Sequence, residues 1–318
     1  MSALSVLVNP VVALGMLWVV PTGLALLGGP RPPALDRIRR AWPLLALPGA
    51  VCLWLPRSGA AVALAAVYAL ATLALALQAP ARLLLTRSLR PREIAVLTAL
   101  ASPSVAGTAL VAERAGHPLF GFDLDLLALT VPHFHFAGFA AALVAGLVHR
   151  TSDGPTARFA ALSVPTGTLL VLLGYFVNDG TELAGAVVLT AGMTAVAVLT
   201  LRERRDVAAD PVTRALLAVS ALVLAATMAL ALSWALGEAT GLPHPSLTWM
   251  AATHGLGNAL GFAVCALLAR RRLLTEHGAR LGDREDPGPG PAPLPSPAPH
   301  PDPRPARDPH RDRSELPT

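Results

Sequence analysis

Long uninterrupted apolar runs dominate the chain, with short polar breaks between them. Residues 59–79 and 165–177 are two of the clearest runs, and neither alternates apolar with polar positions. A run of about 20 apolar residues is long enough to cross a hydrocarbon core about 30 Å thick as a helix. Because every backbone amide must be paired inside lipid, such runs predict membrane-spanning helices.

The pattern predicts an all-α fold, a polytopic transmembrane helical bundle of about nine spans. We place the spans at residues 4–27, 42–55, 59–79, 94–112, 124–148, 159–177, 183–201, 212–236 and 247–269. The second span is the weakest because it is short and contains Pro43 and Pro48. In an alternative interpretation, residues 42–79 form one re-entrant hairpin.

Arginines alternate between the loops, and this alternation predicts the orientation of the bundle. The second loop holds only Arg57, the fourth holds only Arg114, and the sixth and eighth hold none. Cytoplasmic loops carry the excess of basic residues in membrane proteins. We therefore expect the odd loops and the C-terminus in the cytoplasm and the N-terminus outside. The arginines of the odd loops and of the segment after the last span are Arg31, Arg37, Arg39, Arg40, Arg82, Arg87, Arg90, Arg92, Arg150, Arg158, Arg202, Arg204, Arg205, Arg214, Arg270, Arg271 and Arg272.

Composition supports the same class of protein. Hydrophobic residues make up 53% of the chain and charged residues only 14%, against about 25% charged residues in a soluble domain. The formal net charge is +5, but the arginines lie between apolar runs, where topology explains them. We therefore expect a lipid bilayer as the surroundings and no nucleic acid as a partner.

Motifs of soluble enzymes are missing from the sequence. The two cysteines, Cys52 and Cys265, lie singly in apolar runs, which gives neither a disulfide framework nor a CxxC site. The sequence has no P-loop, GxSxG or HExxH pattern. The N-terminus lacks the basic region of a signal peptide, so we interpret it as the start of the first span. A non-enzymatic role is favoured over catalysis.

The chain changes character after the last predicted span. We predict a transmembrane domain over residues 1–275 and a disordered, Pro-rich cytoplasmic tail over residues 276–318. Residues 287–309 are dominated by Pro with Gly, Asp, Arg and Ala, a composition that buries too little apolar surface to offset the entropy of folding. A solvated tail is the favoured interpretation, and a Pro-rich ligand for a partner module is the alternative.

Ionisable residues inside spans are costly, so they are the candidate functional residues. His133 and His135 lie in the fifth predicted span, and His254 lies in the ninth, four residues before Asn258. With a rise of about 1.5 Å per residue, the three histidines fall in the outer half of the membrane. Asn178 and Asp179 follow the sixth span at the same side. We predict an outward-facing polar pocket built from the fifth, sixth and ninth spans.

Helix geometry divides the candidates. Positions i and i+2 are about 200° apart on a regular helix, whereas i and i+4 share a face. His133 and His135 therefore cannot share one ligand shell unless Pro132 loosens the preceding turn. Three interpretations stay open for His133, His135 and His254: hydrogen-bonded packing, a substrate or proton pathway, and ligation of a metal or haem.

The two histidine segments resemble the YndJ-like family of bacterial membrane proteins. The matching residues are His133-Phe134-His135-Phe136-Ala137-Gly138-Phe139, His254-Gly255 and Asn258-Ala259-Leu260-Gly261-Phe262. The resemblance covers most of the membrane region and excludes the Pro-rich tail. It implies a multi-pass protein of the bacterial inner membrane, and it implies no particular activity.

The favoured function is therefore transport or binding of a small solute or ion, with His133, His135, His254, Asn258, Asn178 and Asp179 as contacts. Two other functions are considered: a metal- or haem-binding membrane enzyme or sensor, with the three histidines as candidate metal ligands, and a structural or assembly partner. No residue pattern specifies a cofactor or an oligomeric state.

Overall fold

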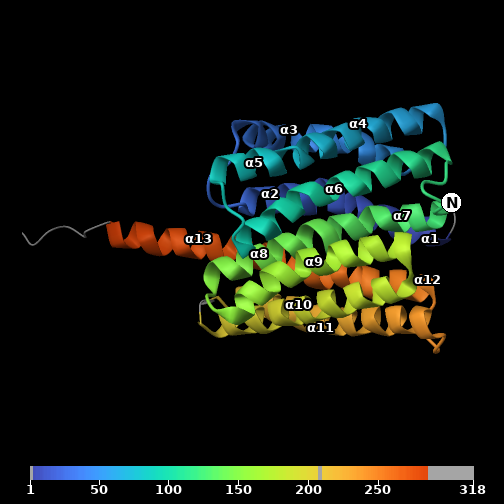
Figure 1. The fold of residues 1–318 in the computed structure, drawn as a ribbon. Helices are drawn as coiled ribbons and strands as arrows, with labels where there is room; N and C mark the ends of the chain where they lie inside the picture. The colour runs from blue at the N-terminus through green and yellow to red at the C-terminus, as the bar shows by residue number, and fades with distance from the viewer. Residues whose placement is uncertain (1–2, 207–209, 286–318) are drawn as a thin grey trace, which may run out of the picture. The chain divides into compact units, whose positions relative to one another are not determined.

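The computed structural model describes residues 3–206 and 210–285. These residues form helices, with one isolated β-bridge between Leu119 and Phe122 in a loop. In chain order the helices are α1 (Ala3–Leu14), η1 (Gly15–Val19), α2 (Val20–Leu26), α3 (Pro33–Cys52), α4 (Gly59–Ala76), α5 (Gln78–Thr86), α6 (Pro91–Ala115), α7 (Leu124–His133), η2 (Phe134–Ala140), α8 (Ala141–Thr151), α9 (Pro155–Val177), α10 (Asp179–Asp206), α11 (Pro211–Thr240), α12 (Leu247–Met250), η3 (Ala251–Gly255), η4 (Gly257–Val264) and α13 (Cys265–Glu285), where η marks π-helical turns (Figure 1).

The predicted helical membrane bundle is confirmed. Among the described residues, eight helical segments are long and apolar enough to cross a membrane. They coincide with the first predicted span and with the third to the ninth. Their bounds are Val6–Leu26, Gly59–Thr86, Pro91–Ala115, Leu124–Thr151, Pro155–Val177, Asp179–Arg205, Pro211–Thr240 and Leu247–Glu276.

The second predicted span, residues 42–55, belongs to α3, whose charged first turns keep it out of that set. Its two ends are nevertheless at opposite ends of the bundle. Just before α3, the Pro30 carbonyl accepts a hydrogen bond from Arg82 at 3.0 Å, and just after it the Leu53 carbonyl accepts one from Asn9 at 2.8 Å. A helix of 20 residues extends about 30 Å. These contacts favour a full crossing over a re-entrant hairpin.

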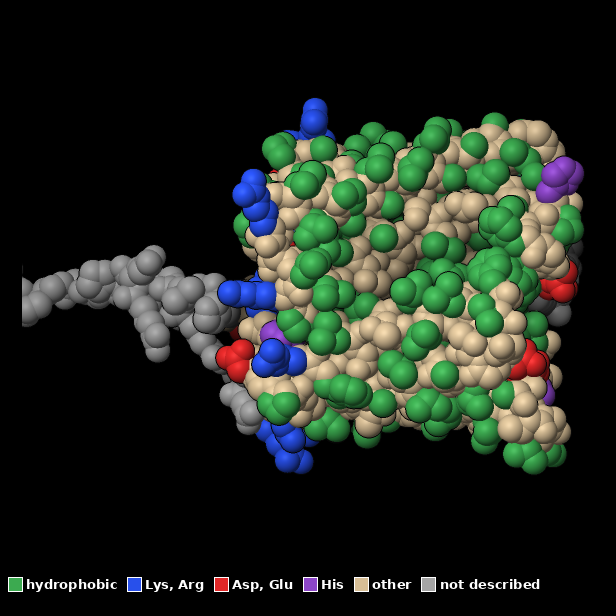
Figure 2. Space-filling view, viewed as in Figure 1, with side chains coloured by type: hydrophobic (Ala, Val, Ile, Leu, Met, Phe, Trp, Pro, Cys, Tyr) green, Lys and Arg blue, Asp and Glu red, His purple; other side chains and the backbone are tan. Residues whose placement is uncertain are grey.

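Charged side chains of the unit formed by residues 1–276 gather at the two ends of its helices (Figure 2). One end carries the odd-loop arginines, and we call it the arginine end. The other carries six carboxylates and, of the described arginines, only Arg57 and Arg114, and we call it the acidic end. Its carboxylates are Glu113, Asp123, Asp125, Asp179, Glu182 and Glu238.

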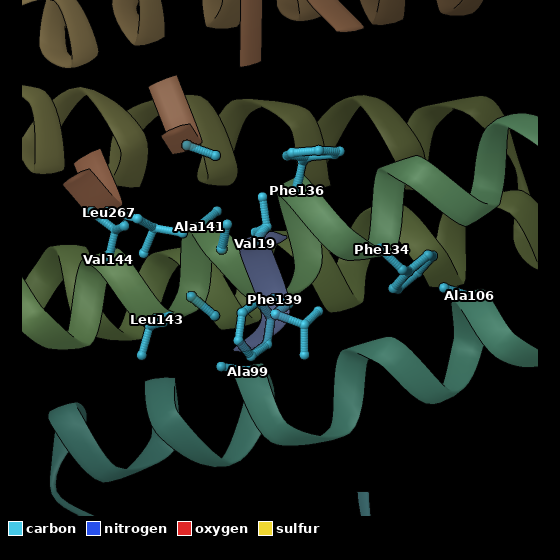
Figure 3. Close-up of a cluster of buried hydrophobic side chains, with 14 of the residues drawn as sticks. Val19, Ala99, Ala106, Phe134, Phe136, Phe139, Ala141, Leu143, Val144 and Leu267 are labelled. Carbon is cyan, nitrogen blue, oxygen red and sulfur yellow. The ribbon is translucent and has the colours of Figure 1, made fainter. Parts of the chain in front are cut away.

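The fifth span, Leu124–Thr151, is the centre of the bundle. It is 83% buried, whereas no other candidate span exceeds 56%. Its aromatic side chains explain why: Phe139 is fully buried against Gly23, and Phe134 and Phe136 project into the same apolar core (Figure 3). Neighbouring helices surround this span on all sides, so its polar residues face protein or a cavity.

Small residues let four of the helices approach one another closely. Gly138 packs against Ser102 of α6, and Gly146 lies against the same helix. Gly257 and Gly261 pack against Thr227 and Val223 of α11, where an added Cβ would approach each side chain to 2.6 Å. The fifth and ninth spans meet each other through η2 and η4, while these four glycines pack against α6 and α11.

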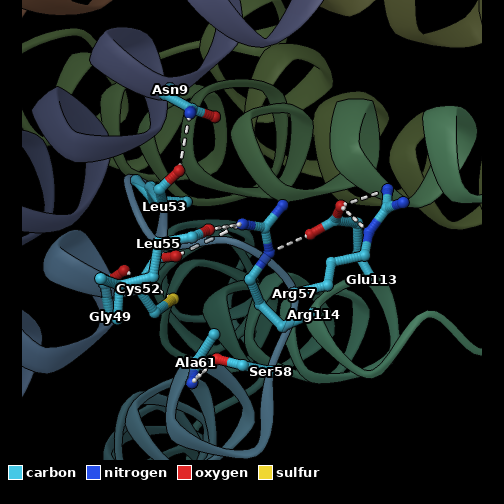
Figure 4. A network of polar contacts seen from close by, with 10 residues as sticks. All are labelled: Asn9, Gly49, Cys52, Leu53, Leu55, Arg57, Ser58, Ala61, Glu113 and Arg114. Carbon is cyan, nitrogen blue, oxygen red and sulfur yellow. Dashed lines mark hydrogen bonds and ion pairs between the residues drawn. The ribbon is translucent and has the colours of Figure 1, made fainter. Parts of the chain in front are cut away.

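An ionic network at the acidic end fastens the loop between α3 and α4 to the end of α6 (Figure 4). Glu113, only 4% exposed, accepts hydrogen bonds from Arg57 Nε at 3.2 Å and Nη2 at 2.9 Å, and it also pairs with Arg114. Arg114 in turn donates to the carbonyls of Cys52 and Leu55, each at 3.3 Å. A buried carboxylate is tolerated only when it is paired in this way.

The predicted boundary at residue 275 falls inside α13, which continues to Glu285. Residues 286–318, which include the predicted Pro-rich segment 287–309, lie outside the described residues.

Candidate functional site

A large cavity lies among the helices on one side of the fifth span. Its volume is about 520 Å³, and its lining is mostly apolar. The walls come from α1, α6, α7, η2, α9, α10, α11 and the start of the ninth span. The predicted fifth, sixth and ninth spans therefore do line one pocket, but four further helices contribute. The polar lining is sparse: Ser104, Thr108, Thr130, His133, Thr168, Glu182, His254 and Asn258.

A second cavity of about 510 Å³ lies at the acidic end and continues the first. The two share six lining residues: Leu126, Tyr175, Phe176, Glu182, Trp234 and Leu247. Unlike the inner cavity, this mouth is polar, because Asn178, Asp179, Glu182 and Glu238 contribute to it. The pair of cavities thus forms an acidic mouth above an apolar chamber.

His133 faces the inner cavity from the last residue of α7. Its ring contacts the Phe134 ring edge-on, with centroids 5.7 Å apart. Neither ring nitrogen has a hydrogen-bond partner in the described part of the chain, and the side chain is exposed to the cavity. His133 is therefore free to bind a molecule in the chamber.

His135 points to the opposite side and packs there. It is 0% exposed. Its Nδ1 lies 2.7 Å from the Val131 carbonyl, and its Nε2 lies 2.5 Å from the Tyr68 hydroxyl. Because a carbonyl only accepts, Nδ1 carries the proton and Nε2 accepts from the hydroxyl. Both ring nitrogens are occupied, and His135 is not among the residues that line the cavity.

Tyr68 links His135 to α3 and η1. The Tyr68 and His135 rings are stacked at 5.9 Å, and Trp42 meets Tyr68 edge-on at 6.2 Å. The Trp42 indole donates to the Met16 carbonyl at 2.9 Å. His133 and His135 therefore point to different places, one toward the cavity and the other into the packed core. This separation is present although η2, which follows Pro132, is π-helical.

His254 and Asn258 form a hydrogen-bonded group with Thr227 of α11. His254 Nδ1 donates to the Thr227 carbonyl at 2.8 Å, and Asn258 Nδ2 donates to His254 Nε2 at 3.0 Å. The Thr227 hydroxyl completes the group by donating to Asn258 Oδ1 at 2.8 Å. His254 and Asn258 lie one turn apart on the same face, as predicted, and both line the inner cavity.

Asn178 and Asp179 line the mouth rather than the chamber. Asn178 accepts from the Thr181 backbone amide at 2.9 Å and so caps the start of α10. Asp179 opens that helix. The predicted site residues therefore fall into three groups: His133, His254 and Asn258 at the chamber, Asn178 and Asp179 at the mouth, and His135 in the packed core.

The three histidines do not converge on one point. Among the described residues, no group of three His, Cys, Asp or Glu side chains is placed to hold a metal ion. His135 and His254 have both ring nitrogens hydrogen-bonded, whereas neither nitrogen of His133 has a partner among the described residues. The arrangement offers one free imidazole in an apolar chamber.

A family model for YndJ-like proteins matches residues 10–262. The chain belongs to the YndJ-like family. The match includes the whole fifth span and the His254 segment, and it covers all of the cavity lining except Leu7 and Val8. No significant match was found among curated proteins or among solved structures.

Together with the eight membrane-capable helices, the match makes this YndJ-like protein a multi-pass membrane protein.

Several residues of the cavities in the YndJ-like protein escape sequence reasoning. Tyr175, Trp234 and Glu238 line the mouth, but each lies near the end of a long apolar helix, where such residues are common at membrane interfaces. Glu182 follows Asn178 and Asp179 at the turn after the sixth span, and this placement in the sequence indicates it. Its position at the junction of the two cavities follows from the close approach of α9 and α10 at Gly174, where an added Cβ would come within 2.5 Å of Glu182.

Proposed function

We propose that this YndJ-like protein binds a small amphipathic molecule, with an apolar body and a positively charged end, as a step in its transport. The apolar chamber with an acidic mouth is the observation that carries this proposal. The apolar body occupies the chamber, and the charged end lies near the carboxylates of the mouth.

The size and chemistry of the chamber support a small-molecule ligand. Ligand pockets in proteins commonly measure about 300–1,000 Å³ and combine an apolar lining with a few polar groups. The chamber, at about 520 Å³, matches both features. His133 supplies one unpartnered polar group at its wall, and the His254–Asn258 pair supplies another polar patch. A bare ion would find too few ligands on such walls.

Charge supports a cationic rather than an anionic end. Asp179, Glu182 and Glu238 line the mouth, and neither cavity has an arginine among its lining residues. A cleft lined by charges of one sign raises the local concentration of ligands of the opposite charge. The basic side chain that lines the mouth is His244, whose Nε2 lies 3.2 Å from Glu238 Oε1.

The proposed orientation places the mouth outside the cell. The arginines gather at the other end, and the positive-inside rule assigns that end to the cytoplasm. The N-terminus is then outside and the C-terminus cytoplasmic, in the inner membrane of a bacterium. The ligand enters the chamber from the exterior.

A pair of matched ions tests the proposal. Tetraphenylphosphonium and tetraphenylborate have the same shape and opposite charge. Binding of each radiolabelled ion is measured separately on the full chain in lipid nanodiscs, with empty nanodiscs as the background. We expect saturable binding of the cation at one site per chain and much weaker binding of the anion.

Two substitutions locate the site. Glu182→Gln removes one carboxylate of the mouth, which should weaken cation binding by up to about tenfold. Asp125→Asn is the matched control, because Asp125 is exposed at the same end and lines neither cavity. Ala186→Phe fills the chamber and should abolish binding, whereas Val187→Phe on the exposed face of the same helix should not.

The outcomes separate the parts of the proposal. Equal binding of the two ions, unaffected by Glu182→Gln, would refute the cationic end. Binding that survives Ala186→Phe, or no saturable binding of either ion to folded protein, would refute the chamber as the ligand site.

A further inference from the structure

Three arginines converge at the arginine end of the bundle, far along the chain from one another. Arg92 lies in the first turn of α6, Arg150 in the last turn of α8, and Arg270 in α13. The loop at Gly28 brings the first two together: a Cβ added there would lie 2.9 Å from Arg150 Nη1 and 3.4 Å from Arg92 Nη2. The two guanidinium groups therefore lie against the same short piece of backbone.

Arg270 completes the cluster. The charged groups that act electrostatically on Arg150 are Arg92, Arg270 and Glu203. Arg270 is 4% exposed and pairs with Glu203 through Nη1 at 2.5 Å, while its Nε and Nη2 are buried without a hydrogen-bond partner in the described structure. Glu203 thus pairs with Arg270 and acts electrostatically on Arg150.

A neighbouring arginine, Arg82, shows a buried guanidinium group whose charge and hydrogen bonds are satisfied by the protein. Arg82 is 0% exposed, and it donates to both oxygens of Glu93 at 2.8 and 3.0 Å and to the carbonyls of Pro30 and Gly28. Arg92 and Arg150 have no such partners among the described residues. Like charges held close together in a partly buried place repel, and a buried donor without an acceptor destabilises the fold. An anion bound between the guanidinium groups removes the repulsion between them.

We infer that Arg92, Arg150 and Arg270 form a binding site for a phosphate group. Guanidinium groups pair with phosphate oxygens through two parallel hydrogen bonds, which makes arginine the preferred residue for such sites. The cluster lies at the arginine end, which the proposed orientation places at the cytoplasmic surface of the membrane. Basic pockets between helices at the cytoplasmic surface bind anionic lipid headgroups. The phosphate of phosphatidylglycerol and free inorganic phosphate share the required chemistry.

Lipid retention by the detergent-solubilised full chain tests the inference. Native mass spectrometry counts the bound lipids after addition of phosphatidylglycerol or phosphatidylcholine of equal chain length. Inorganic phosphate forms a separate arm, read by thermal stability. We expect at least tenfold preferential retention of phosphatidylglycerol.

The variants keep the total charge matched. Arg92→Gln with Arg150→Gln removes two charges from the cluster while leaving the Arg270–Glu203 pair intact. Arg37→Gln with Arg40→Gln removes two charges from exposed positions at the same end. We expect the first pair of substitutions to abolish the preference and the second pair to preserve it. Arg150→Gln alone serves if the double variant does not fold.

The arms distinguish the two sources of phosphate. If inorganic phosphate at low millimolar concentration stabilises the wild type but not the double variant, and lipid retention shows no preference, the site takes free phosphate and the lipid assignment is overturned. If the cluster variant and the exposed control behave alike in both arms, the phosphate site itself is overturned.

Discussion

The two histidines of the fifth span are expected to have separable roles, and Tyr68→Phe is the sharpest test. This substitution removes only the hydroxyl that donates to His135 Nε2. The phenyl ring keeps the edge contact with Trp42 and the close packing against Gly49. His135 would then retain its bond to the Val131 carbonyl and lose the partner of its other nitrogen.

The expected loss of stability follows from the burial of this pair. A buried acceptor left without a partner costs about 1–3 kcal/mol. Hydrogen bonds between membrane helices average only about 0.6 kcal/mol, because the unfolded chain also finds partners in the membrane. Tyr68 and His135 are both 0% exposed, so water cannot replace the hydroxyl in the folded state. We therefore expect a loss of about 1–2 kcal/mol in the free energy of unfolding.

The assay is denaturation of the purified protein in mixed micelles by increasing fractions of sodium dodecyl sulfate, followed by circular dichroism. His133→Phe is the matched control, because His133 has no hydrogen bond among the described residues and faces the chamber. It should change the free energy of unfolding by less than about 0.5 kcal/mol and reduce cation binding instead. A double-mutant cycle of Tyr68→Phe with His135→Phe that gives no coupling energy would refute the assignment of His135 to packing.

Three further predictions concern the frame around the site. Arg82→Gln should lower the free energy of unfolding by about 3–5 kcal/mol, because it leaves the carboxylate of Glu93 without its ion-pair partner. Wild-type stability of this variant in the denaturation assay would refute the contribution of the Arg82–Glu93 pair. Gly261→Leu should destabilise by about 1–3 kcal/mol through its clash with Val223, whereas Leu260→Ala at an exposed position should change little. Reporter fusions at Arg87 and Arg204 should both read cytoplasmic, and an exterior signal from either would overturn the orientation.

The sequence predicts the spans well because lipid imposes a simple requirement. Every backbone amide in the hydrocarbon must be paired locally, so apolar length alone predicts helices. The second span shows the limit of this reasoning. The charged first turns of α3, with Asp36, Arg37, Arg39 and Arg40, lower its mean hydropathy, and only the contacts at the two ends of α3 favour a full crossing.

The site is predicted only in part. The spacing of His254 and Asn258 places them on one face, and helix geometry separates His133 from His135. Nothing in the spacing identifies which of that pair faces the cavity, because the choice depends on Tyr68, 67 positions away in the chain. The sequence indicates the acidic mouth only through Asn178, Asp179 and Glu182, since the contributions of Tyr175, Trp234 and Glu238 depend on how α9, α10 and α11 pack.

A chamber inside a membrane bundle needs walls that do not collapse, and apolar packing cannot supply them alone. Lipid tails are as apolar as the side chains, so interhelical hydrogen bonds and close packing hold membrane helices together. Each of two interhelical polar pairs has at least one member on a helix that borders the chamber. The Tyr68–His135 hydrogen bond joins α4 to the side of the fifth span that faces away from the chamber. The Thr227–Asn258 hydrogen bond joins α11 to the ninth span. The polar groups predicted as one site thus divide between keeping the chamber open and meeting what enters it. A substitution in the first set should lower stability and binding together, and a substitution of His133 should lower binding alone.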